Sequence, residues 1–291
     1  MFPIHLKLFG EFNTFYEGIY FSLGVAFAFL ITFRNAGKMG VDRDMLSLLL
    51  VVALGSGIIG ASLFQQLFYK DVSSFSEIFT TWSKGLSITG AVVIGPVLTY
   101  LYCRYKKLPY WKLFALVVPG IILAQGVGRL GCFMNGDAHG TASELPWAMS
   151  FPRYGHTVPG FEELKDNRYQ SDAWKYSMRN GLVQQDDQRS ALLHPSQLYE
   201  FLADLLLFFV LIWLLQKVRL KAWNEKIVPF VYIGGYAVIR FLIEFTRADR
   251  DLAEGAALSQ MQWVLLVVLL VSAVLVVKFR KESLPQPKSD P

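Results

Sequence analysis

The sequence predicts an all-α, polytopic integral membrane protein with seven transmembrane helices and one extracytoplasmic head loop. Of its 291 residues, 53% are hydrophobic and only 18% are charged, which is too apolar for an ordinary soluble domain. Seven apolar windows approach the length of about 20 residues that a helix needs to cross a bilayer. The net charge is +5, but the basic residues flank the apolar windows, where they act as topology signals. We therefore expect the membrane as the environment and no nucleic acid as a partner.

The seven windows are separated by polar segments, and each predicts one spanning helix of a single transmembrane domain, residues 1–291. Their length excludes short buried core helices as a general explanation. In chain order they cover residues 18–33, 45–68, 85–103, 113–133, 197–215, 228–245 and 261–277.

The basic residues are distributed unequally between the two sides of the predicted bundle. Fifteen lysines and arginines lie in the short segments after the first, third, fifth and seventh windows, whereas those on the other side hold five. Cytoplasmic segments carry the excess of positive charge, so the N-terminus is predicted outside and the C-terminus in the cytoplasm. Residues 135–195, the one long hydrophilic connection, fall outside and are too long for a plain connector, which predicts a head insertion. The tail, residues 282–291, is predicted to be disordered.

Ionisable residues occur inside three of the windows, at the ends that the charge pattern places outside. Arg129 lies near the end of the fourth window, and Glu200 lies one turn into the fifth. Tyr236, Arg240 and Glu244 recur every four residues and share one face of the sixth helix. Charges at such depth are costly and mark functional sites, although Arg129 could simply reach the interface and Arg240 could form a purely structural pair with Glu244.

Two arginines supported by carboxylates and facing inward near the outer leaflet predict a site for an anion that comes from the membrane. The planar fork of arginine suits phosphate because it binds two oxygens at once. The obvious membrane anion is a phospholipid headgroup, so the residues alone predict an enzyme or carrier that captures a phospholipid laterally.

Several motifs, in this order and spacing, resemble bacterial prolipoprotein diacylglyceryl transferases. The most specific is His-Pro-Ser-Gln-Leu-Tyr-Glu at 194–200, whereas Gly-Arg-Leu-Gly at 128–131 would be weak alone. Phe-Met-Asn-Gly at 133–136, Pro-Trp-Ala-Met-Ser-Phe-Pro at 146–152 and the run 236–247 agree, so the resemblance spans almost the whole chain. It implies transfer of a diacylglyceryl group from phosphatidylglycerol to the lipobox cysteine thiol of a preprolipoprotein, forming a thioether and releasing glycerol phosphate. The implied location is the bacterial plasma (inner) membrane, with preprolipoprotein signal peptides as partners and no cofactor or metal.

The resemblance also implies roles for individual residues. Two arginines hold the lipid phosphate and stabilise charge on the departing phosphate, and a tyrosine and a glutamate orient the second of them. The catalytic residues expected on this basis are Arg129, Arg240, Tyr236, Glu244 and His194, and the substrate-binding residues are Arg129, Asn135, Tyr16, Glu200 and Thr89.

The chain departs from the family pattern at the expected base. Thr89 stands where the family usually has a histidine, and a threonine cannot deprotonate a thiol near neutral pH. His139 or His194 could take that role, since histidine titrates in this range, although His194 could equally serve hydrogen bonding at the start of a helix. Alternatively no side-chain base is needed, because two nearby arginines increase the thiolate fraction of the substrate. Cys132, which replaces an asparagine, is expected to be structural rather than nucleophilic.

Two other classes of function stay open at this stage. One is a phospholipid or anion transporter that uses the same arginines as a binding site, although its charges would be expected at the midplane rather than at one face. The other is a diverged paralogue that binds lipid or signal peptide without transfer, which the threonine at position 89 keeps open.

Overall fold

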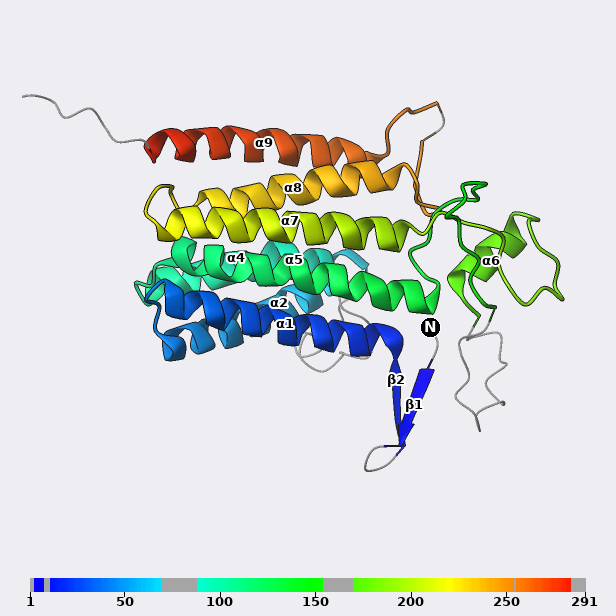
Figure 1. The fold of residues 1–291 in the computed structure, drawn as a ribbon, viewed down its shortest axis with the longest axis horizontal. Coiled ribbons are helices and arrows are strands. Elements are labelled where there is room, and N and C mark those ends of the chain that lie inside the picture. The colour runs from blue at the N-terminus through cyan, green and yellow to red at the C-terminus, as the bar shows by residue number, and fades with distance from the viewer. Residues whose placement is uncertain (1–2, 8–10, 70–87, 154–169, 254, 284–291) are drawn as a thin grey trace, which may run out of the picture. The chain divides into compact units, whose positions relative to one another are not determined.

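A computed structural model describes residues 3–7, 11–69, 88–153, 170–253 and 255–283 of the chain (Figure 1). The described residues form a two-stranded hairpin and eight helices. Two compact units result, one made of Met1–Thr32 with Val117–Pro291 and the other of Phe33–Leu116. Each unit is described by itself below.

Six helices are long and apolar enough to cross a membrane, counting only the described residues. They correspond to six of the seven predicted windows, which confirms a polytopic membrane protein. In chain order they are α1 (Tyr16–Lys38), α2 (Arg43–Tyr69), α5 (Tyr110–Asn135), α7 (Ser196–Arg219), α8 (Ile227–Glu244) and α9 (Gln260–Glu282).

The third predicted window is helical as α4 (Ile88–Tyr105), but α4 is not among these six helices. The window begins three residues earlier, at 85–87, which lie outside the described residues. Seven spans therefore remain a prediction.

A short antiparallel hairpin, which the all-α prediction did not include, precedes α1. Strand β1 (Pro3–Lys7) pairs with β2 (Glu11–Phe15), with Pro3 opposite Phe15 and Lys7 opposite Glu11. Ile4 and Leu6 alternate with polar residues, a period of two that predicts strands but that a search for 20-residue apolar windows overlooks.

In the unit Phe33–Leu116, α2 packs against α4 through small residues. A Cβ on Gly60 would lie 2.7 Å from the carbonyl oxygen of Gly90, and one on Gly95 would lie 3.1 Å from the Cα of Gly57. Glycines at such crossings let helix backbones approach closely where no hydrophobic effect drives association within lipid.

In the other unit, α5 contacts α1 in the same way, and α7, α8 and α9 lie side by side (Figure 1). A Cβ on Gly120 would lie 2.8 Å from the carbonyl oxygen of Ala28, and one on Gly235 would lie 2.8 Å from a methyl group of Leu207. Between α5 and α8, the hydroxyl of Tyr232 donates a hydrogen bond to Gln125 Oε1 at 2.7 Å.

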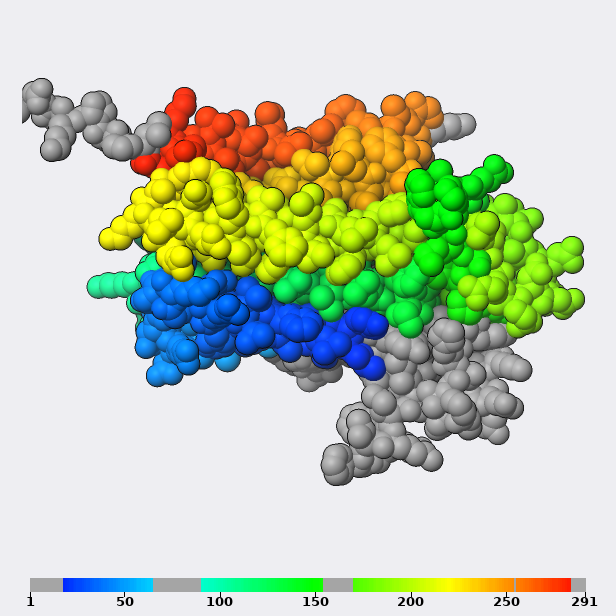
Figure 2. Space-filling view, in the orientation of Figure 1, coloured from blue at the N-terminus to red at the C-terminus, as the bar shows by residue number. Residues whose placement is uncertain are grey.

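Helices α7 (yellow-green) and α9 (orange-red) both reach the surface in the space-filling view (Figure 2), and each exposes several large apolar side chains. An apolar surface of this extent fits contact with lipid, in agreement with the assignment of both helices as spans. The largest exposed side chains include Leu202, Leu206 and Phe209 of α7 and Trp263, Val264 and Val267 of α9.

The described part of the predicted head insertion is folded. It contains the short helix α6 (Asp172–Arg179), which Ser171 caps by accepting a hydrogen bond from the backbone N–H of Trp174. Phe151, Ala173 and Leu193 form a buried cluster beneath it. Residues 154–169 of the insertion and residues 284–291 of the tail lie outside the described residues.

Candidate functional site

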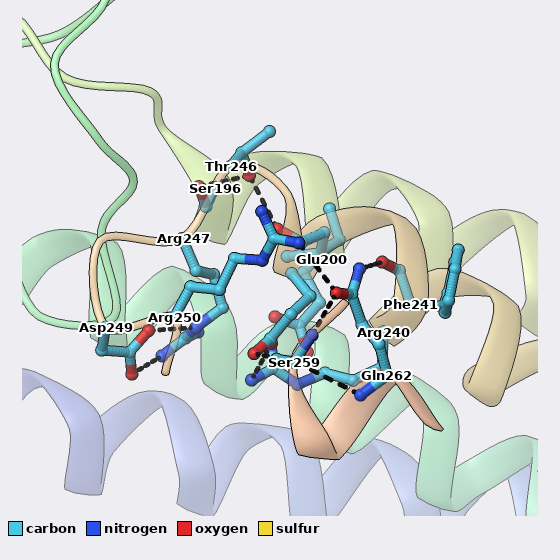
Figure 3. A network of polar contacts seen from close by, with 12 residues as sticks. Ser196, Glu200, Arg240, Phe241, Thr246, Arg247, Asp249, Arg250, Ser259 and Gln262 are labelled. Carbon is cyan, nitrogen blue, oxygen red and sulfur yellow. Dashed lines mark hydrogen bonds and ion pairs between the residues drawn. The ribbon is translucent and has the colours of Figure 1, made fainter. Parts of the chain in front are cut away.

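Three loops meet at Gly140, where α5 ends, α7 begins and α8 ends. The backbone N–H of Gly140 donates to the carbonyl of His194 at 2.9 Å, and the N–H of Thr141 donates to the carbonyl of Thr246 at 2.9 Å. The hydroxyls of Ser196 and Thr246 share a further hydrogen bond of 2.9 Å (Figure 3). These bonds hold the polar ends of three helices together.

Arg129 of α5 pairs with Glu200 of α7 at this end. The distance from Arg129 Nη2 to Glu200 Oε1 is 2.8 Å. The side chain of Glu200 is 1% exposed and that of Arg129 is 25% exposed. The arginine partner accounts for a glutamate one turn into an otherwise apolar helix.

Arg240 and Glu244 of α8 form a second ion pair at an Nη2 to Oε2 distance of 2.9 Å (Figure 3). The N-terminus of α9 supports this pair, since Ser259 Oγ donates to Glu244 Oε1 at 3.3 Å. Ser259 also forms a capping box with Gln262, and Gln262 Nε2 donates to the carbonyl of Phe241 at 3.2 Å. Glu244 is thus held by both α8 and α9.

Tyr236 lies between the two ion pairs. It interacts electrostatically with Glu200, Arg129 and Arg240. Its ring stacks on that of Tyr232, one turn earlier, at a centroid distance of 6.4 Å. The structure therefore brings together Arg129, Arg240, Tyr236, Glu200 and Glu244, as the sequence predicted.

Each arginine keeps hydrogen-bonding capacity beyond its ion pair. A guanidinium carries five N–H donors, and the two ion pairs use one nitrogen of Arg129 and one of Arg240. Nη1 of Arg240 is buried and has no hydrogen-bond partner among the described residues. A buried donor without a partner is costly, so this atom is suited to an anionic ligand.

Asn135, the last residue of α5, is fully buried, and neither atom of its amide has a hydrogen-bond partner within the described part of the chain. Gln197 of α7 lies close to this end of α5, since its Nε2 donates to the carbonyl of Asp137, two residues after Asn135, at 2.6 Å. The orphaned amide of Asn135, six residues after Arg129 in the chain, has a donor and an acceptor available for a ligand.

A third arginine, Arg247, lies just beyond α8 and binds Asp249 through two hydrogen bonds of 2.7 and 2.6 Å (Figure 3). Burial opposes ionisation of Asp249, but the hydrogen bond and charge of Arg247 outweigh it and hold the pKa of that carboxyl below its ordinary value. Next to it, Arg250 donates to Gln262 Oε1 at 3.0 Å. In the sequence, Arg247 is distinguished only as the last residue of the run 236–247 that carries the family resemblance.

The two described histidines within residues 135–195, His139 and His194, are engaged in local contacts. His194 Nδ1 lies 3.3 Å from the hydroxyl of Tyr199, which also accepts a 2.8 Å hydrogen bond from Trp147 Nε1. This favours the structural alternative for His194. His139 packs on Tyr176 at a centroid distance of 5.1 Å, and burial lowers its pKa.

For Tyr16 and Thr89 the structure gives the position of the backbone in a helix. Tyr16 is the first residue of α1, and Thr89 lies in the first turn of α4, in the other compact unit. Their predicted roles in substrate binding stay predictions.

One buried acid in this cluster escaped the sequence reasoning. Asp204 of α7, one turn beyond Glu200, is 1% exposed, and neither carboxyl oxygen has a hydrogen-bond partner among the described residues. The signal was present, because a carboxylate inside an apolar helix calls for the same explanation as Glu200.

Comparisons with known proteins agree with the geometry. A family model described as prolipoprotein diacylglyceryl transferase matches residues 3–278. A phosphatidylglycerol–prolipoprotein diacylglyceryl transferase of Bordetella avium is 31% identical, covering 98% of this chain and 97% of its own. Proteins of the same name from Pediococcus pentosaceus and Clostridium tetani are 30% and 27% identical over 97% and 96% of this chain, and 91% and 99% of their own. The chain belongs to the prolipoprotein diacylglyceryl transferase family.

Proposed function

We propose that this protein transfers the diacylglyceryl group of phosphatidylglycerol to the lipobox cysteine thiol of preprolipoproteins. The observation that carries the proposal is the convergence of Arg129 and Arg240, from two different helices, around Tyr236 at one end of the spans. Two guanidinium groups so placed can grip the phosphodiester of a lipid that enters sideways from the bilayer.

In the proposed reaction, the sulfur of the acceptor cysteine attacks the glyceryl carbon that carries the phosphate. A thioether bond forms, and the carbon–oxygen bond to phosphate breaks with its electron pair on oxygen, so that glycerol phosphate leaves. Negative charge grows on the phosphate during this step. Arg129 and Arg240 stabilise that charge, while Glu244 and Tyr236 hold Arg240 in position.

The proposal includes a topology. Seven spans with an outside N-terminus and a cytoplasmic C-terminus place the arginine cluster and the folded segment around α6 at the outer face of the bacterial inner membrane. The basic residues after alternate windows support this orientation. The acceptor would arrive there as the membrane-inserted helix of a signal peptide.

The proposal is tested by complementation of a strain depleted of its own transferase. Arg129→Ala and Arg240→Ala should reduce lipoprotein modification by at least about a hundredfold, since loss of one preorganised donor to a developing charge typically costs that much. The lysine variants at both positions should recover only part of it, because an ammonium cannot bind two oxygens in the plane of a fork. Arg104→Ala, an exposed arginine at the end of α4, is the matched control and should support growth.

Purified protein in vesicles distinguishes transfer from the other classes of function. Thioether formation on a lipobox peptide supports the proposal. Release or movement of phosphatidylglycerol without any acceptor peptide indicates a transporter, whereas saturable peptide or lipid binding without product indicates a paralogue that has lost the chemistry.

A further inference from the structure

Asp204 lies between α5 and α7, directly beyond the Arg129–Glu200 pair. Its Cβ is 3.2 Å from the position a Cβ on Gly126 would occupy, and Gly126 is three residues before Arg129 on the same face of α5. Eight residues separate Asp204 from the first residue of α7, which places it about 12 Å along the helix axis. This carboxyl is therefore well inside the span.

Among the described residues, one cation interacts electrostatically with Asp204. The groups that interact with it electrostatically are Glu200 on its own helix, Arg129 on α5, and Tyr232 and Tyr236 on α8. Arg129 is already paired with Glu200. A buried carboxylate without its own counterion and without a donor costs several kcal/mol, so packing alone does not account for this residue.

The charges of the cluster bear on whether Asp204 is ionised or protonated when the site binds an anion. Arg129 and Arg240 balance Glu200 and Glu244, so these four residues carry no net charge. Arg247 balances Asp249, and Arg250, which binds Gln262, adds one positive charge beside α9. Among the described residues none of these cations pairs with Asp204, and an ionised carboxylate there would weaken the attraction for a phosphodiester. A buried carboxyl without its own counterion takes up a proton, so Asp204 is expected to be protonated.

Building on the proposed transfer reaction, we propose that Asp204 is a positioning residue that enters the reaction protonated and donates a hydrogen bond to Glu200. Residues four apart on a helix face each other, so the two carboxyl groups are suitably spaced for this bond. Glu200 is then held between Asp204 and Arg129 as a carboxylate and takes the proton of the incoming thiol. This role needs no histidine, in a chain whose residue 89 is threonine.

The proton and charge balance follows directly. Before the step, Glu200 carries one negative charge, the phosphodiester one, and the thiol none. The thiol proton moves to Glu200, the sulfur electron pair forms the bond to carbon, and the carbon–oxygen pair stays on the phosphate, which becomes a dianion. Glu200 is then neutral, so Arg129 loses its carboxylate counterion at the moment when the phosphate gains charge. Total charge is unchanged, and the guanidinium becomes fully available to the leaving group.

The test compares three forms of the purified full-length protein with phosphatidylglycerol and a lipobox peptide. Asp204→Asn keeps an N–H donor of similar shape, whereas Asp204→Leu has a similar volume and no donor. We expect kcat to fall by about tenfold in the asparagine variant and by about a hundredfold or more in the leucine variant, with little change in KM for the lipid. The acid limb of the kcat–pH profile should move to higher pH in the leucine variant and stay near its wild-type position in the asparagine variant.

A merely structural Asp204 gives a different result. Replacement of a buried ionisable group by leucine is often neutral or stabilising, so the thermal stability of Asp204→Leu should match or exceed that of the wild type. Equal kcat in the leucine variant and the wild type overturns the proposal, and so does a leucine variant at least as active as the asparagine variant. Equal losses in both variants with an unmoved pH profile overturn it as well, since they indicate a need for an ionised carboxylate. If the leucine variant does not accumulate, Asp204→Ala is scored by the same criteria.

The same assay separates this inference from the proposed function. A wild-type protein that forms no thioether under any condition refutes the proposed function. An active wild type whose Asp204 variants are equally active refutes only the role of Asp204.

Discussion

Replacement of Gly140 by alanine should reduce transfer by about a hundredfold or more, because the structure leaves no room for a Cβ at this position. A Cβ built at this position would lie 2.5 Å from the Cβ of His194, 2.5 Å from the carbonyl oxygen of Thr246 and 2.6 Å from the hydroxyl of Ser196. One of these atoms is backbone and another is a Cβ, so neither can rotate away. The three neighbours belong to the start of α7 and the end of α8.

The magnitude follows from these distances. Carbon atoms in ordinary contact are about 3.5–4.0 Å apart, so relief of the clash requires shifts of about 1 Å in at least two loops. Overpacking of this kind costs about 1–3 kcal/mol of stability. The larger effect falls on the reaction, because a displacement of about 1 Å in a catalytic arrangement can cost about a hundredfold in rate. The loops that move lead into α7, which carries Glu200, and follow α5 and α8, which carry Arg129 and Arg240.

The assay is complementation together with thermal unfolding of the purified variant in detergent. Gly140→Ala should reach the membrane at reduced melting temperature and should lose about a hundredfold or more of its transfer rate. Gly37→Ala is the matched control, because a Cβ there has no atom within 4 Å and alanine is the better helix former. Wild-type activity and stability in Gly140→Ala would show that the three loops are not held together as the structure indicates.

Three further predictions concern the Arg247–Asp249 pair, the buried His139 and the hydrogen bond between Trp147 and Tyr199. Asp249→Asn should lower the free energy of unfolding at pH 7 by only a few tenths of a kcal/mol, since the side chain of Asp249 is 66% exposed. The folded-state pKa of Asp249 lies below its ordinary 3.8, so this loss of stability should be complete above pH 3.8 and should vanish as the pH falls through the folded-state pKa. Burial lowers the pKa of His139 below 6.5, so the wild type should lose stability as the pH falls from 6.5, and His139→Asn should lose less over the same range in thermal melts. Tyr199→Phe removes the acceptor of the 2.8 Å hydrogen bond from Trp147 and should cost about 1 kcal/mol in denaturant or thermal unfolding, with no effect on the product formed.

The spans were predictable because hydropathy is summed over many residues. A lipid-exposed helix needs apolar side chains at nearly every position, so six windows appear among the described residues as helices long and apolar enough to span a membrane. The first and last residues of the helices were less predictable. Helices α5 and α9 extend beyond their windows, to Tyr110 and Glu282, because backbone hydrogen bonding continues into the interface where side-chain polarity no longer matters. The hairpin before α1 was missed because strand alternation is a local signal that a long window averages out.

The site was predictable to the extent that buried charge demands a partner. That rule pointed from Arg129 to Glu200 across two helices, and from Arg240 to Glu244 along one. It applies equally to Asp204, which lies four residues beyond the family motif at 194–200. The support of Glu244 by Ser259 was not predictable, since a serine at a helix start is explained by capping alone and its second role depends on how α9 meets α8.

The pairing of both arginines with carboxylates is a condition for an anion site at this depth rather than an obstacle to one. An unpaired guanidinium in an apolar helix would be too costly to keep in place while the site is empty, and it would turn toward the headgroup layer instead. A single ion pair removes most of that cost and fixes the plane of the fork, yet leaves several N–H donors, among them the partnerless Nη1 of Arg240. A phosphodiester that enters between the two ion pairs can therefore bind without breaking either of them. When Glu200 becomes protonated during the reaction, Arg129 loses its counterion and stabilises the charge on the leaving phosphate more strongly.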